Sequence, residues 1–79
     1  MLTNEQQIEA AERGEHWGKQ EAGHQLEAVE NGHRREPATW TTGQWCGSNP
    51  FATDDDRCWE YDSAIDRAAQ AAYEAAVAQ

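Results

Sequence analysis

The sequence predicts a mostly helical α+β fold: two long antiparallel helices joined by a small tryptophan-containing β-hairpin, within one domain of residues 1–79. Three observations predict it. Long stretches at both ends of the chain repeat small or apolar residues at three- and four-residue spacing. A middle segment with both prolines separates them. Within that middle, Thr and Trp are concentrated, and these residues favour strands.

The first helix is expected over residues 3–32. Thr3 can cap it, with Gln6 in capping-box position three residues later. Asn31-Gly32 supplies the stop, because glycine accepts the left-handed conformation that ends helices. The predicted buried face consists of Ile8, Ala11, Gly18, Ala22, Leu26 and Val29.

Three glycines inside this helix, Gly14, Gly18 and Gly23, each weaken it by about 1 kcal/mol relative to alanine. They either allow close approach of a second helix or mark a break between residues 14 and 18. We expect a continuous or slightly kinked helix. Trp17 falls opposite Ile8 on the helical wheel, so it is either the edge of a second packing face or an exposed contact.

The hairpin is expected within residues 37–52. A two-residue turn at Thr42-Gly43 would place Trp40 opposite Trp45, a cross-strand pair worth roughly 0.2–1 kcal/mol. Other large apolar residues are scarce, so the four tryptophans are the main source of buried area. We therefore expect this pair to close one end of the helical core.

The last helix is expected over residues 53–78, with Thr53 as cap and Asp56 completing a capping box. Alanine dominates this segment and favours helix while burying little area, so close packing against the first helix is implied. Its predicted buried face consists of Cys58, Tyr61, Ile65, Ala68, Ala69, Ala72 and Ala76.

Fifteen acidic and six basic residues give a net charge of −9, and both halves of the chain are negative. Direct binding to DNA, RNA or anionic lipid is disfavoured, because their phosphates would be repelled. A protein with a basic surface would be attracted; the alternative is that the charge merely maintains solubility. The start of the chain lacks the features of a secretory signal, and no apolar run is long enough to span a bilayer. We expect a cytoplasmic monomer or small homo-oligomer.

The candidate chemistry is limited. Cys46 and Cys58 are expected as two buried thiols in a reducing cytoplasm, and a disulfide between them is the alternative. The spacing of Cys and His residues does not suit zinc, and the acids at 54–56 lack the Gly and Glu that a calcium loop requires. Nothing places Cys46 beside His33 as a nucleophile and base. We expect no enzymatic activity, no metal and no cofactor.

The strongest candidate for contact is the acidic start of the last helix around Trp59. An exposed tryptophan can stack on Arg or Lys of a partner, while carboxylates supply complementary charge. The predicted partner-binding residues are Asp54, Asp55, Asp56, Trp59, Glu60, Asp62 and Asp66.

The stretch NPFATDDDRCWEYDSAIDRA, residues 49–68, resembles the second half of ribosome modulation factor-like proteins. Those proteins pair an aromatic-after-proline turn with a helix carrying Arg, Trp and Ala at similar spacing. That family is basic, whereas this chain is acidic. The resemblance implies an adaptor that binds the ribosome or a regulator.

In size, charge and composition the whole chain resembles the small acidic anti-CRISPR proteins of phages and prophages. This resemblance implies a non-enzymatic inhibitor, acting as a DNA mimic, that occupies a basic surface of a Cas effector complex and blocks recruitment of target DNA. A type I effector, Cascade, is the target that the Ala and Trp usage favours. The leading hypothesis is this inhibitor, and the ribosome-binding adaptor is the alternative.

Overall fold

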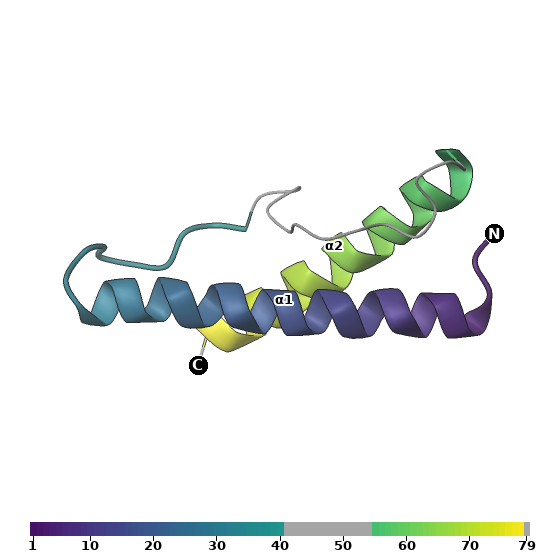
Figure 1. Cartoon of the computed structure of the whole chain (residues 1–79). Helices are drawn as coiled ribbons and strands as arrows, with labels where there is room; N and C mark the ends of the chain where they lie inside the picture. The colour runs from purple at the N-terminus through teal and green to yellow at the C-terminus, as the bar shows by residue number, and fades with distance from the viewer. Residues whose placement is uncertain (41–54, 79) are drawn as a thin grey trace.

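The computed structural model describes residues 1–40 and 55–78, which form two helices, α1 (Asn4–Glu30) and α2 (Asp55–Val77). Figure 1 shows that the helices cross obliquely and that both begin at the same end of the molecule. The segment after α1 turns back and runs alongside it.

Local chemistry sets both ends of α1. At its start, Gln6 N donates to Thr3 Oγ1 at 3.2 Å and Thr3 N donates to Gln6 Oε1 at 2.9 Å, which confirms the predicted capping box. At its end, Gly32 has a φ of +80°, and the His33 amide donates to the Ala28 carbonyl at 2.8 Å. This is a Schellman motif, and it confirms the predicted Asn-Gly stop.

A ladder of small residues in α1 forms the contact with α2. Its buried residues recur every four positions: Ala10, Gly14, Gly18 and Ala22. The buried residues of α2 have the same spacing: Tyr61, Ile65, Ala69 and Tyr73. Helices whose four-residue ridges interlock cross obliquely, and Figure 1 shows an oblique crossing.

The two glycines of the ladder lie where the helix backbones approach most closely. A Cβ built on Gly14 would lie 2.8 Å from Ala68 Cβ, and one built on Gly18 would lie 2.9 Å from the carbonyl carbon of Ala69. The helix continues unbroken through both positions. The glycines therefore serve close approach of the second helix, and the alternative of a break is wrong.

The two helices run parallel, so the predicted antiparallel arrangement is wrong. Gly14 faces Ile65 and Gly18 faces Ala69, so positions on both helices advance together. The prediction placed a hairpin over one end of the helix pair, and a connection that stays at one end makes the helices antiparallel. Here twenty-four residues separate Glu30 from Asp55. At about 3.3 Å per extended residue, such a connection can return along the roughly 40 Å of α1.

The predicted β-hairpin is also wrong as part of the fold class, because the described ranges 1–40 and 55–78 contain helices and no strand. Residues 33–40, hereafter the strap, lie against the helix pair without secondary structure of their own. The Trp40 ring packs on Tyr73 of α2, with centroids 5.3 Å apart, in place of a cross-strand partner. Trp45 and the Thr42-Gly43 turn lie outside the described residues.

Contacts with helix side chains, rather than pairing with another strand, attach the strap to the helix pair. Trp40 is 7% exposed, and its indole N–H donates to Asp66 Oδ1 at 3.3 Å. The Ala38 amide donates to Gln25 Oε1 at 3.2 Å, and the Tyr73 hydroxyl donates to the Ala38 carbonyl. The strap therefore covers one side of the helix pair.

The buried faces differ from the predicted ones more in α1 than in α2. Ile8 and Leu26, expected in the core, are 57% and 39% exposed, because the contact follows small residues rather than the large apolar ones. In α2, the predicted Tyr61, Ile65 and Ala69 are buried. Helix α2 begins at Asp55, and the predicted cap Thr53 lies outside the described residues.

Among the described residues, the core consists of two small clusters on either side of the glycine crossing. One contains Leu2, Ala10, Tyr61 and Ile65. The other contains Ala22, Trp40, Ala69 and Tyr73, with Trp17, Ala76 and Val77 packed against it. Neither described helix has the length and apolar character needed to cross a membrane.

Candidate interaction surface around Trp59

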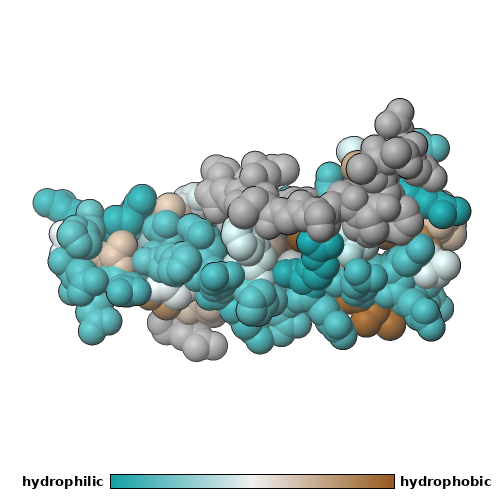
Figure 2. Space-filling model, viewed as in Figure 1, coloured by the Kyte–Doolittle hydropathy of each residue, from teal (hydrophilic) through white to brown (hydrophobic). Residues whose placement is uncertain are grey.

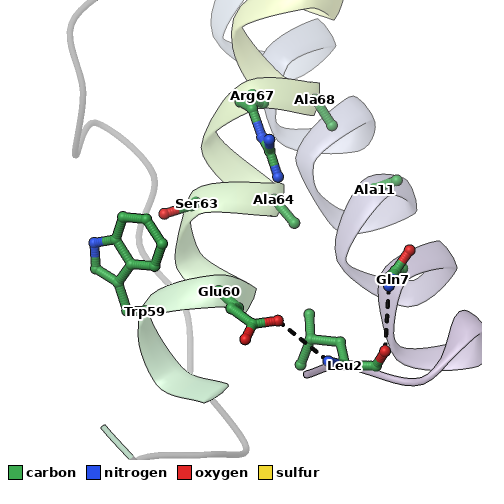
Figure 3. Close-up of a pocket in the computed structure, with 9 residues that line it drawn as sticks. All are labelled: Leu2, Gln7, Ala11, Trp59, Glu60, Ser63, Ala64, Arg67 and Ala68. Carbon is green, nitrogen blue, oxygen red and sulfur yellow. Dashed lines mark hydrogen bonds between the residues drawn. The ribbon is translucent and has the colours of Figure 1, made fainter. Parts of the chain in front are cut away.

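Trp59 is the large aromatic side chain that the described structure leaves open. It lies near the start of α2 and is 72% exposed, whereas Trp40 is buried and Trp17 packs against the core. Figure 3 shows its indole beside Ser63, directed away from Leu2 and α1. Of the two interpretations of Trp17, the structure supports the packing face.

An open groove of about 730 Å³ borders Trp59 between the two helices (Figure 3). It lies where the N-terminal halves of α1 and α2 diverge from the crossing. It is lined by Leu2, Gln7, Ala11, Trp59, Glu60, Ser63, Ala64, Arg67 and Ala68. Its floor is therefore apolar, and charged groups stand at its edges.

The predicted acids nearest Trp59 have two different environments. Asp56, one turn before Trp59, is exposed. Glu60 accepts a hydrogen bond from the Leu2 amide at 3.2 Å, and its carboxylate lies 3.5 Å from the N-terminal amine of Met1. Asp56 is thus directed to solvent, while Glu60 fastens the start of the chain to α2.

Asp62 and Asp66 are half-buried and engaged within the molecule. Asp66 accepts the hydrogen bond of Trp40, and Asp62 Oδ2 lies 4.0 Å from the Sγ of Cys58. The structure therefore does not gather these two acids with Asp56 on one open surface. Asp54 lies outside the described residues, and only the backbone of Asp55 is described.

Of the two cysteines considered for a disulfide, one lies in the described part of the chain. Cys58 is half-buried on α2 beside Asp62. Cys46 lies outside the described residues. Among the described residues, no group of three or more His, Cys, Asp and Glu side chains is arranged to hold a metal ion.

Arg67 is a groove residue that sequence reasoning missed. Its exposed side chain lines the groove with Ala64 and Ala68 (Figure 3). Arg67 is absent from the predicted buried face of this helix, and helical spacing alone cannot show that a groove opens beside it. A cationic group at this edge opposes the entry of a second cation.

The same side of the helix pair continues past the crossing as a second groove of about 630 Å³. It is lined mainly by alanines of α2, with Glu15 and Lys19 of α1 at its edge. Lys19 Nζ donates to Glu15 Oε1 at 2.7 Å, and this hydrogen bond and charge hold the pKa of Glu15 below its ordinary value. This edge is therefore internally neutralised and contributes little to the net negative field.

The face of the molecule in Figure 2 is dominated by hydrophilic residues, with hydrophobic ones scattered between them. Met1 and Ile8 are, with Trp59, the most exposed large apolar side chains among the described residues. All three belong to the end where both helices begin, because the helices are parallel. Antiparallel packing would have placed Trp59 at the opposite end from Met1 and Ile8.

Comparison of the chain with protein-family models, with curated protein sequences and with solved structures gives no match. Its function is therefore inferred from its own residues.

Proposed function

We propose that this chain is a non-catalytic binding protein that attaches, through the start of α2 around Trp59, to a basic surface of a partner protein complex. Inside a cell, and in the host cytoplasm if a phage encodes it, such a protein would compete with nucleic acid for that surface. The observation that carries the proposal is Trp59, 72% exposed beside the exposed carboxylate of Asp56 in a chain of net charge −9.

Physical chemistry supports this combination as a binding surface. Tryptophan contributes more than most side chains at interface centres, because its ring covers a large area at little cost in side-chain entropy. Exposed acids steer a basic partner by long-range attraction and raise the association rate. The same net charge disfavours direct contact with nucleic acid phosphates.

The resemblance to small acidic anti-CRISPR proteins names the first partner to test, a type I CRISPR-Cas effector complex. The experiment is a pull-down of the purified effector by this chain at low and at high salt. We expect capture that weakens as salt rises, because screening reduces the attraction between exposed charges. We also expect displacement of the chain by target DNA.

Matched charge reversals distinguish the surface from the overall charge. Asp56→Lys and Glu27→Lys change the net charge equally, and both positions are exposed, but Glu27 lies near the far end of α1. We expect Asp56→Lys to abolish most capture and Glu27→Lys to reduce it slightly. Equal losses would overturn the assignment to α2, and capture unaffected by either variant would overturn the electrostatic mechanism.

The alternative function, a ribosome-binding adaptor, is tested by co-sedimentation with ribosomes. If the chain co-sediments with ribosomes from a lysate and is not captured on the effector, the inhibitor proposal is overturned in favour of the adaptor. The acidic surface disfavours ribosomal RNA, so a ribosomal protein would then be the contact.

A further inference from the structure

The open face of the Trp59 indole is the starting point for a narrower inference about the partner. Trp59 is held on a regular helix, so its backbone position is fixed while its ring remains accessible. Its ring lies beside Ser63, which also lines the groove, and the indole is directed away from α1 (Figure 3). An accessible indole face attracts cations through its quadrupole.

Asp56 supplies a carboxylate next to this ring. Residues three apart on a helix are surface neighbours, with Cβ atoms about 5–6 Å apart, so Asp56 and Trp59 lie side by side. The Asp56 side chain is exposed. A side chain laid on the indole can therefore also reach a carboxylate.

We propose that Trp59 and Asp56 together receive an arginine side chain of the partner, in preference to lysine. A guanidinium is planar, so it can stack on the indole while its edge donates hydrogen bonds to the carboxylate. An ammonium group is a compact point charge that is strongly hydrated and cannot do both in one plane. The inference rests on the proposed function and specifies its contact.

The molecule uses related chemistry internally. Arg13 Cζ lies 5.6 Å from the centroid of the Tyr61 ring, and Arg13 Nη1 donates to the Tyr61 hydroxyl at 3.1 Å. The Tyr61 hydroxyl in turn donates to Glu9 Oε1 at 3.1 Å. Guanidinium, ring and carboxylate thus occur together within the fold, and at Trp59 the ring and carboxylate are present without an arginine of this chain described over them.

The adjacent groove determines which partner residues can lie next to that arginine. Its apolar floor, with Leu2, Ala64 and Ala68, accepts an uncharged side chain, and Arg67 at its edge repels a second cation. The occupant is therefore a segment with one arginine at Trp59 and an apolar residue beside it, rather than a uniformly basic tract.

The test compares two short peptides of identical sequence, with leucine beside a single basic residue, one carrying arginine and the other lysine. Affinities are measured by calorimetry at low salt on the full chain. Cation–π and bidentate contacts at an exposed site give a preference for arginine of about fivefold or more. The indole N–H signal of Trp59, assigned in NMR spectra by its loss in Trp59→Phe, should shift on binding of the arginine peptide.

Three variants make the comparison specific. Trp59→Leu is expected to bring the arginine-to-lysine ratio to about one, and Asp56→Asn to weaken arginine binding more than lysine binding. Leu26→Ala, an exposed leucine near the far end of α1, is the control and should leave both affinities unchanged. Circular dichroism checks that each variant keeps its helices.

Equal affinity for the two peptides, or a ratio unchanged by Trp59→Leu, overturns the arginine inference and leaves the proposed function intact. Failure of the proposed function is a different result, namely capture of the partner complex that ignores both Asp56→Lys and Trp59→Leu. The two failures are therefore distinguishable.

Discussion

Gly14 and Gly18 determine how closely the two helices approach. A methyl group at either position would lie closer than van der Waals contact to the α2 backbone, and at Gly14 also to Ala68, and backbone cannot move aside as a flexible side chain does. Gly23, in the same helix, has nothing within 4 Å of an added Cβ. Within α1, Gly14 and Gly18 are therefore required for packing and Gly23 is not.

Alanine substitutions at these positions should have opposite effects on the free energy of unfolding. Gly23→Ala is expected to raise it by about 1 kcal/mol, the difference in helix propensity. Gly18→Ala gains the same propensity but forces the helices apart, and overpacking costs about 1–3 kcal/mol or more, so a net loss is expected. Urea unfolding of both variants measures this, and a stabilised Gly18→Ala would contradict the described packing.

Residue type predicted the environment of some side chains and not others. The caps of α1 were predictable, because Thr-x-x-Gln and Asn-Gly act within a few residues. The core face of α1 was predicted only in part: Gly18 and Ala22 are buried as expected, but large apolar residues were also assumed to be buried. Ile8 is exposed, whereas Gly14 lies in the contact. The four-residue spacing of Ala10, Gly14, Gly18 and Ala22 was the signal that could have identified it.

At the scale of elements, Trp40 belongs to the strap and packs on a helix, whereas the prediction placed it in a hairpin. Thr and Trp suggested strand pairing, but a strand needs a partner ladder, and here the partner is a helix. Tyr73 of α2 contacts the Trp40 ring and donates to the Ala38 carbonyl. Strand propensity could not identify what this segment packs against.

Because of Tyr73, the free energy of unfolding is expected to fall at alkaline pH. Burial, and secondarily the nearby Glu21 carboxylate, raise the pKa of Tyr73 above its ordinary value of about 10. The folded chain therefore retains this proton where the unfolded chain has lost it. This contribution is fully present below about pH 10 and is lost as pH rises through the folded pKa.

Tyr73→Phe is expected to lower the free energy of unfolding by about 1 kcal/mol at neutral pH, because the hydrogen bond to Ala38 is lost. Above about pH 10 its stability should decline less steeply than that of the parent chain. Urea unfolding across this pH range measures the difference, and parallel declines would contradict the role of Tyr73.

At the scale of the whole molecule, the direction of the second helix determines which surfaces lie together. Both helices were predictable from periodicity, because helix formation depends on local pattern. Their relative direction was not, because it depends on how the long connection runs, and no short-range signal specifies that. The parallel direction places the start of α2, with Trp59, beside Leu2 and the chain terminus.

Distances between spin labels test this topology directly. Labels are placed on cysteines introduced at exposed positions, with Cys46 and Cys58 replaced by serine. For the pair Glu5→Cys and Asp56→Cys we expect a short distance. For Glu30→Cys and Asp56→Cys we expect roughly the length of α1, about 40 Å. An antiparallel pair would reverse the order of the two distances.

The parallel crossing also has a consequence for the route by which the chain folds. In antiparallel helices the first contacts form next to the turn, and later ones follow in steps. Here the hydrogen bonds that tie α1 and the residue before its cap to α2 link residues 48, 52 and 58 positions apart, so none of these three closes a short loop. The entropy of closing a loop of about fifty residues must be lost before any interhelical contact is gained. Helix docking should therefore be a single concerted event, and slower than in helical proteins of this size with mainly local contacts.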